Sequence, residues 1–254
     1  MLQKKKKLSK KAIKEDKLIN FYKSSVNFFE KYQSKIFIYV GVLVVVAAAV
    51  YFYENQKIIN DDKAALELSR IMPLFDQGAY LEAIEGKQGT NIMGLKNLVE
   101  EYSGTENGET AKIYLADCYS FLGNYEEAFN YYKDYDGSID YFEAASLAGQ
   151  AGYYAMNGDF DKAANLYLNA SKQSQVNSQN PDYMLNAGIC FLKIGENDEA
   201  KILFNKIKED YSTSLANREV DKYLAAINWY FFIIQNEILN FQKITNDYSN
   251  LAKK

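Results

Sequence analysis

The sequence predicts an all-α protein in which a single N-terminal transmembrane helix precedes a solenoid of helical repeats. Three observations lead to this prediction. An 18-residue run from Ile36 to Tyr53 contains no charged residue, a glycine motif recurs at intervals of 35 and 37 residues, and only 2 Pro occur among 254 residues. Low Pro content favours helices, and repeats of this length are typical of paired helices that stack on one another.

The first 35 residues form a basic segment, which we expect to contain an amphipathic helix. They hold eleven Lys against three acidic residues, a charge of +8, whereas the other 219 residues hold 18 basic and 30 acidic residues, a charge of −12. Apolar side chains such as Ile19, Tyr22, Val26 and Phe29 recur at helical spacing. Such a helix suits a membrane surface, where lysines attract anionic headgroups. The lysines serve most simply as a topology signal, and contact with ribosomal RNA is the alternative.

Residues 36–53 have the length and composition of a transmembrane helix. At helical rise this run covers about 27 Å, close to the hydrocarbon thickness of a bilayer. Aromatic residues lie at both ends of the run, as in the aromatic belts of membrane helices. By the positive-inside rule, the lysine excess predicts that residues 1–35 are cytoplasmic and that the chain from residue 54 lies on the far side.

Two other interpretations of the apolar run are weaker. A buried core helix would show an amphipathic period, and this run has none and follows a lysine-rich segment. A cleaved signal peptide would agree with the A-x-A pattern of Ala47 and Ala49, but its basic region would be far shorter than 35 residues.

Residues 54–214 are predicted to form repeats similar to tetratricopeptide (TPR) repeats. The segments LGNYEEA, NGDFDKA and IGENDEA align on Gly123, Gly158 and Gly195, and QGAYLEA around Gly78 is a weaker copy. The spacings are close to the 34-residue TPR period, in which two antiparallel helices flank a tight turn. Small residues and aromatic residues recur at positions expected in the core, namely Ala116, Ala151 and Gly188 on the first helix and Tyr132, Tyr167 and Phe204 on the second.

The repeat register also predicts a groove for partners along the first helix of each pair. Its candidate residues are Ile113, Asp117, Phe121, Ala148, Gly152, Met156, Leu185, Ile189 and Lys193. Most of them are apolar or small, which suits an amphipathic helix or a hydrophobic stretch of a partner. An acidic C-terminal tail would need several basic side chains, and only Lys193 is basic. In the alternative interpretation, neighbouring helices cover some of these side chains.

Residues 215–254 are predicted to form a capping helical region. A terminal cap needs a polar outer face, yet Trp229, Tyr230 and Phe232 add apolar surface there. These three residues are therefore candidates for a contact with a protein or a membrane surface, and additional core packing is the alternative.

The composition argues against catalysis. The chain has no His, which excludes Ser-His-Asp and Cys-His nucleophiles and His-ligated zinc. Cys118 and Cys190 occupy equivalent positions two repeats apart, so we expect both to be unpaired and buried. Adjacent carboxylates such as Asp61 and Asp62 or Glu100 and Glu101 point in different directions on a helix and indicate solvated surface. We expect no enzyme activity, catalytic residue, cofactor, metal or small-molecule substrate, and the −12 charge disfavours nucleic acid as a partner of the far-side domain.

The order of these features resembles a known family. A basic tail, one anchor, repeats directly after it and segments such as LKNLVEEYSGTENGETAKIYLADCY and FNKIKEDYSTSLANREVDKYLAAI are similar to the YfgM-like ancillary subunits of the bacterial SecYEG translocon, over roughly residues 15–225. The resemblance implies a single-pass inner-membrane protein with a periplasmic domain. It also implies a position beside SecYEG and the membrane-anchored chaperone PpiD, a role in assisting newly exported proteins, and no catalytic residues.

Two functional hypotheses follow from the sequence. The first is a scaffold associated with the SecYEG translocon. The alternative is a TPR scaffold for another envelope process, such as cell division or outer-membrane assembly. The last 30 residues, after Leu224, extend beyond the resemblance.

Overall fold

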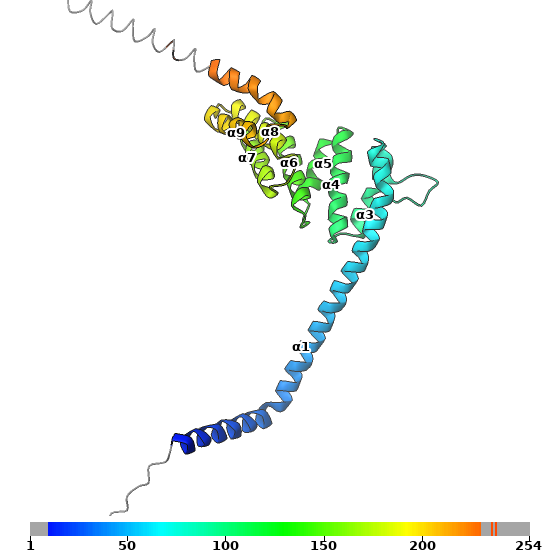
Figure 1. Ribbon diagram of the computed structural model, residues 1–254. Coiled ribbons are helices and arrows are strands. Elements are labelled where there is room, and N and C mark those ends of the chain that lie inside the picture. Colours follow the sequence, from blue (N-terminus) through cyan, green and yellow to red (C-terminus); the bar gives the residue numbers. More distant parts are fainter. Residues whose placement is uncertain (1–9, 230–234, 236, 238–254) are drawn as a thin grey trace, which may run out of the picture. The chain divides into compact units, whose positions relative to one another are not determined.

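The computed structural model describes residues 10–229, 235 and 237, and most of these residues are helical. The helices are α1 (Lys10–Asp76), α2 (Tyr80–Glu85), α3 (Leu95–Glu101), α4 (Glu106–Phe121), α5 (Tyr125–Lys133), α6 (Asp140–Met156), α7 (Phe160–Gln173), α8 (Asn180–Lys193) and α9 (Asn197–Asp210) (Figure 1). Residues 215–229 are also helical. Within the described ranges, the only β pairing is an isolated bridge between Gly86 and Met93. The predicted all-α class is confirmed, with a long apolar helix before helical repeats.

The chain divides into two compact units, residues 1–58 and residues 59–254. In the first unit, the described part of α1 contains a window of mean hydropathy 2.5 that is not buried. Val42, Leu43 and Val45, for example, are all more than half exposed. A core helix would be mostly buried, so this interpretation of the run is disfavoured. By length and composition, the helix is a candidate membrane span.

The second unit repeats one turn four times. Helices α1, α4, α6 and α8 are each followed by a glycine with positive φ, from 75° to 85°, at Gly78, Gly123, Gly158 and Gly195. After each glycine, the next backbone N–H donates to the carbonyl five residues earlier at 2.9 Å, as from Asn124 to Tyr119. This bond closes a Schellman motif, which needs a left-handed residue that glycine provides most readily. The glycine motifs in the sequence therefore correspond to four equivalent helix–helix joints.

Small residues on one helix receive aromatic rings from its neighbours, as the repeat pattern predicts. A Cβ added to Gly188 of α8 would lie 2.4 Å from the ring of Phe204 of α9, which is fully buried. A Cβ on Gly149 of α6 would lie equally close to the ring of Tyr132 of α5. Ala116 and Ala151 are also fully buried. Each helix from α4 to α8 packs against the next helix along the chain, and α9 is followed by the helical residues 215–229.

Two larger core clusters close the ends of the described array. At one end, residues of α1 pack with α2, α3 and α4, the buried members being Ala64, Leu68, Ile71, Leu74, Ala83, Ile84, Leu95, Leu98, Tyr102, Ala111, Leu115 and Cys118. At the other end, α8 and α9 pack with residues 215–227 through Met184, Leu185, Ala200, Phe204, Ile207, Ala216, Val220 and Ile227. The start of the predicted capping region is therefore joined to the last repeat by buried apolar contacts.

Both cysteines have the state expected from the repeat register. Cys118 and Cys190 are buried and unpaired. Burial raises the pKa of the Cys118 thiol to about 12 and also raises that of Cys190, so both thiols stay protonated and unreactive at neutral pH.

Candidate partner-binding pocket

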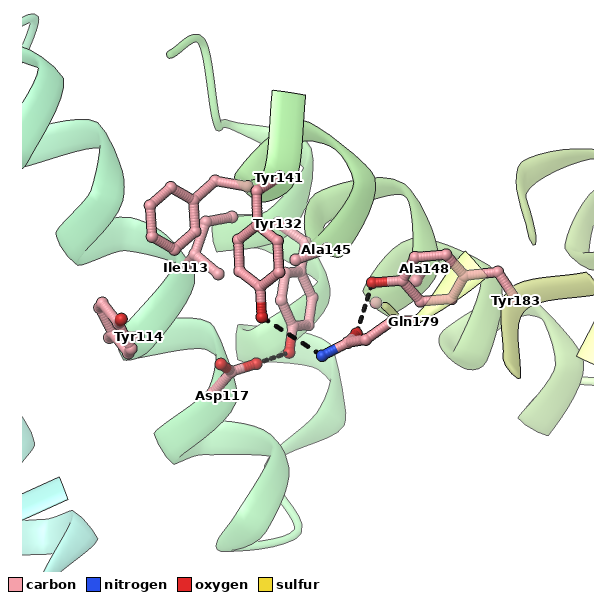
Figure 2. Close-up of a pocket in the computed structure, with 11 residues that line it drawn as sticks. Ile113, Tyr114, Asp117, Tyr132, Tyr141, Ala145, Ala148, Gln179 and Tyr183 are labelled. Atoms are coloured by element: carbon pink, nitrogen blue, oxygen red, sulfur yellow. Dashed lines mark hydrogen bonds between the residues drawn. The ribbon is translucent and has the colours of Figure 1, made fainter. Parts of the chain in front are cut away.

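Three of the nine predicted groove residues line one pocket. This pocket, here called the tyrosine pocket, has a volume of about 280 Å³. It is lined by Ile113, Tyr114, Asp117, Tyr132, Tyr141, Phe142, Ala145, Ala148, Gly149, Gln179 and Tyr183 (Figure 2). The residues come from α4, α5, α6 and the start of α8, so helices of three successive pairs contribute to one site.

The repeat packing places the polar groups of this pocket around Asp117. The ring of Tyr132 lies against Gly149, where a larger residue would displace it. From this position its hydroxyl donates a hydrogen bond to Oδ1 of Asp117 at 2.5 Å. Gln179, the residue before α8, donates through Nε2 to the Tyr141 hydroxyl at 3.3 Å and accepts at Oε1 from the Tyr183 hydroxyl at 2.6 Å (Figure 2). These bonds hold the tyrosine rings in place and leave Oδ2 of Asp117 without a hydrogen-bond donor among the described residues.

The electrostatic character of the pocket is acidic. Burial raises the pKa of Asp117 to about 6, and the hydrogen bond from Tyr132 opposes this shift only in part, so the carboxyl is mostly ionised at neutral pH. The pKa of Tyr183 rises to about 12, first through burial and then through nearby groups that include Asp117 and Asp182. Burial, Tyr141, Asp117 and Asp76 likewise raise the pKa of Tyr114. No lysine or arginine is among the lining residues.

A smaller pocket of about 190 Å³ lies next to the tyrosine pocket and is apolar. It is lined by Ser120, Tyr125, Ala128, Phe129, Tyr132, Gly149, Gly152, Tyr153 and Met156. Two predicted groove residues, Gly152 and Met156, are therefore part of this second site. Because both pockets share Tyr132 and Gly149, one aromatic ring forms a common wall between them.

The other four predicted groove residues lie elsewhere. The exposed ring of Phe121 stacks on Tyr80 of α2 with centroids 4.7 Å apart. Leu185 is buried in the cluster around α9, and Ile189 packs against that cluster. Lys193, near the end of α8, is exposed. Five of the nine positions therefore line two pockets, two belong to a core and two are exposed, so they do not form one continuous strip.

The candidate contact residues of the tail are described in part. Trp229 is 66% exposed at the end of the helical segment 215–229. Tyr230 and Phe232 lie outside the described residues. An exposed Trp next to a buried Ile227 is consistent with a contact surface on this segment, which stays a prediction.

The carboxylates considered as catalytic candidates have structural or surface positions. Asp61 accepts hydrogen bonds from the backbone N–H and the side-chain amide of Asn107, which ties α1 to the start of α4. Asp62, Glu100 and Glu101 are exposed. In the part of the chain that the structure describes, no cluster of three or more acidic or Cys side chains could hold a metal ion.

The sequence register missed seven residues of the tyrosine pocket, which are Tyr114, Tyr141, Phe142, Ala145, Gly149, Gln179 and Tyr183. The repeat pattern aligns Ile113 and Asp117 of α4 with particular positions of α6 and α8. Most of the residues that α6 and α8 contribute to the pocket lie nearer to the N-terminus of each helix than those aligned positions do. This stagger arises from how successive pairs incline against one another, which a repeat period does not specify. The available signal was the tyrosine at the start of both helices, in DYFEAAS and NPDYMLN.

Comparison with known proteins identifies one repeat. Residues 182–214 match the family described as tetratricopeptide repeat, a segment that contains most of α8, the turn at Gly195 and all of α9. No curated protein and no solved structure matches the chain. The match and the all-helical fold of the described residues fit a TPR protein, and TPR arrays are typically non-enzymatic scaffolds for protein–protein interaction.

Proposed function

We propose that this chain is a non-enzymatic, membrane-anchored TPR scaffold that associates with the SecYEG translocon. There it holds a periplasmic chaperone of the PpiD type, assists newly exported proteins, or does both. The proposal rests on the order of three features, which are a segment with eleven Lys, an apolar helix and the repeats. The first buried residue of the repeats, Ala64, lies only 11 positions after Tyr53, so the repeats begin directly after the apolar run.

The charge distribution supports one orientation. The +8 segment favours a cytoplasmic N-terminus, and the anchor then leads the acidic remainder of the chain into the periplasm. The protein is then a single-pass component of the bacterial inner membrane. Residues 1–53 contact lipid through the exposed apolar surface of α1 and through the lysines that precede the apolar run 36–53.

The repeat surface supports binding of a protein segment. The tyrosine pocket and the smaller pocket beside it have volumes of about 280 and 190 Å³. They suit single side chains of a partner segment laid across the first helices of the pairs. The net acidic charge of the repeats would repel a phosphate backbone.

Affinity purification tests the proposal. The tagged full-length protein is purified from its own membranes in mild detergent, and bound proteins are identified by mass spectrometry. A matched control bait contains residues 1–58, which form the first compact unit, without the repeats. We expect SecY with the full-length bait, together with a periplasmic chaperone that the control bait does not recover.

Each outcome has a defined meaning. A full-length bait that recovers no Sec component contradicts the translocon assignment. Recovery of division or outer-membrane assembly factors in its place would support the alternative envelope scaffold. A chaperone recovered equally by both baits would contradict a role of the repeats in holding it.

A further inference from the structure

We propose that the tyrosine pocket binds the positively charged side chain of a lysine or arginine in a partner protein. The inference rests on the proposed protein-binding function and names the chemistry that the repeats recognise. It reverses the expectation from the sequence, in which the groove was expected to take hydrophobic groups. One acidic group, Asp117, and several aromatic rings line the pocket, and no lysine or arginine lines it (Figure 2).

The carboxylate of Asp117 is the first element of recognition. Its Oδ1 accepts the bond from Tyr132, and within the described residues no lysine or arginine pairs with it. Its Oδ2 has no hydrogen-bond donor among the described residues and is not fully buried, so this oxygen can be reached from the pocket. An ammonium or guanidinium group that enters would therefore find one free, charged acceptor.

The tyrosine rings are the second element. Rings from α4, α5, α6 and α8 line the same cavity, and a cation is attracted to an aromatic face when it lies within about 6 Å of the ring centroid. Hydrogen bonds through Gln179 fix Tyr141 and Tyr183, so these two faces are organised before a ligand arrives.

The size of the pocket is the third element. A volume of about 280 Å³ accepts one long side chain. Ile113, Ala145 and Ala148 provide an apolar wall along which the methylene stem of lysine or arginine can pack. An acidic side chain would face Asp117 at close range, which is unfavourable. A purely apolar one would desolvate Oδ2 of Asp117 without giving it a donor, and only the bond from Tyr132 to Oδ1 would remain.

The ionisation of Asp117 agrees with this role. Burial raises its pKa to about 6, so in the unbound protein the carboxylate is ionised at some cost at neutral pH. A bound cation would offset this cost. The titratable groups around it are Tyr114 on its own helix and Tyr132, Tyr141 and Tyr183 on the three other elements. Burial raises the pKa of Tyr114, Tyr132 and Tyr183 above the ordinary tyrosine value, so these three hydroxyls stay neutral at pH 7. Affinity for a cation should therefore fall as the pH drops below about 6 and Asp117 becomes protonated.

Single amino-acid probes test the proposal directly. The full-length protein in detergent micelles is titrated with the N-acetyl methylamides of lysine, arginine, norleucine and glutamate, and the tyrosine ring signals are followed by NMR. Norleucine is the matched control, because it has the lysine stem without the charge. We expect saturable shifts of the Tyr141 and Tyr183 signals, assigned through Tyr→Phe variants, with the lysine and arginine probes only.

Four variants test which groups of the pocket contribute to the binding energy. Asp117→Asn should weaken lysine binding by about tenfold or more, since a hydrogen bond to a charged group is lost. Glu199→Gln removes the same charge from an exposed position of α9 and should leave binding unchanged. Tyr141→Leu should weaken binding several-fold, whereas Tyr141→Phe keeps the aromatic face and most of the affinity. Circular dichroism confirms that each variant is folded.

The proposal fails if norleucine binds as tightly as lysine, if glutamate binds preferentially, or if Asp117→Asn binds lysine as well as the original protein does. Absence of a saturable shift at tens of millimolar probe overturns it as well. The experiment contains no Sec component. If the protein binds lysine but does not recover SecY, the lysine-binding pocket stands and the association with the translocon is rejected. If the protein recovers SecY but does not bind lysine, only the proposal for the pocket is rejected.

Discussion

Replacing Lys112 with methionine is expected to lower the unfolding free energy of the repeats by about 3–5 kcal/mol. Lys112 lies on α4, and its Nζ is 3.0 Å from Oε2 of Glu109 and 2.8 Å from Oδ2 of Asp134. The same Nζ donates to the backbone carbonyl of Asp134 at 2.9 Å. This group therefore joins α4 to the end of α5.

The magnitude follows from burial. The side chains of Lys112 and Glu109 are only 8% and 5% exposed, whereas that of Asp134 is 73% exposed and stays hydrated. Burial lowers the pKa of Lys112, but the hydrogen bonds to Asp134 and Glu109 outweigh it and raise the pKa, so the ammonium is charged. Its removal leaves the Glu109 carboxylate buried without a cation, with the backbone N–H groups of Asp136 and Gly104 as the remaining donors at 2.9 and 3.4 Å among the described residues.

Lys162→Met is the matched control. Lys162 and Asp159 also form a pair three residues apart, with an Nζ to Oδ2 distance of 2.8 Å, but their side chains are 60% and 37% exposed. Exposed pairs contribute about 0–1 kcal/mol, because water hydrates both charges after the pair is broken. Both variants therefore remove the lysine of a pair three residues apart and differ chiefly in burial, and Lys162→Met also removes a cation from above the Tyr154 ring, 5.0 Å from its centroid.

Thermal and urea unfolding of the full-length chain, followed by circular dichroism in mild detergent, measures both variants. At about 2–4 °C per kcal/mol for a domain of this size, Lys112→Met should lower Tm by about 6–20 °C. The double variant Lys112→Met/Glu109→Gln should recover part of the loss, because the amide carries no charge. Equal small losses in Lys112→Met and Lys162→Met would refute the reasoning, as would a double variant no more stable than Lys112→Met.

Three further predictions concern the pocket, the packing and the topology. The pKa of Asp117 is raised from 3.8 to about 6, so the folded state binds the proton more tightly than the unfolded state does. Relative to Asp117→Asn, the original protein should gain about 2–2.5 kcal/mol of stability in urea titrations as the pH falls from neutral to about 4, and a pH-independent difference would contradict this. Gly188→Ala places a Cβ 2.4 Å from a buried ring and should lower the unfolding free energy by about 1–3 kcal/mol. Gly152→Ala, whose Cβ has no atom nearer than 3.5 Å, should raise the unfolding free energy by about 0.5–1 kcal/mol. Melting temperatures that shift in the same direction would disprove the packing argument. A membrane-impermeant maleimide should label Ser212→Cys in intact spheroplasts but should label Ser24→Cys only after the cells are lysed. The two native thiols are buried and should give no background labelling. The opposite labelling pattern would reverse the proposed orientation.

The repeated joints could be predicted from the sequence because their cause is local. A left-handed residue at Gly123, Gly158 and Gly195 is needed within one turn of chain, so glycine recurs at a fixed place in the pattern. Even the weaker copy at Gly78 has the same geometry. The small residue at Gly188 and the ring of Phe204 were likewise predictable, since both positions follow from the period alone.

The pocket was only partly predictable because its cause is not local. The repeat period correctly predicted that Asp117 and Ala148 lie on the surface that forms the pocket. It assumed, however, that equivalent positions of successive helices lie side by side across the array. In the structure, α8 contributes through Tyr183, near its start, and Leu185 turns into the core. Which residues meet across helices depends on their inclination, which is set by the volumes of the side chains between them.

The four equivalent joints also make the array modular. Each joint forms its own bonds within six residues, and the helices between joints contact mainly their immediate neighbours. Stability in such an array is a sum over units and their shared faces, so a helical pair can be duplicated or deleted between two joints without redesign of the others. If the repeats bind a partner segment as proposed, the number of pairs, more than the details of any one pair, sets how long that segment can be.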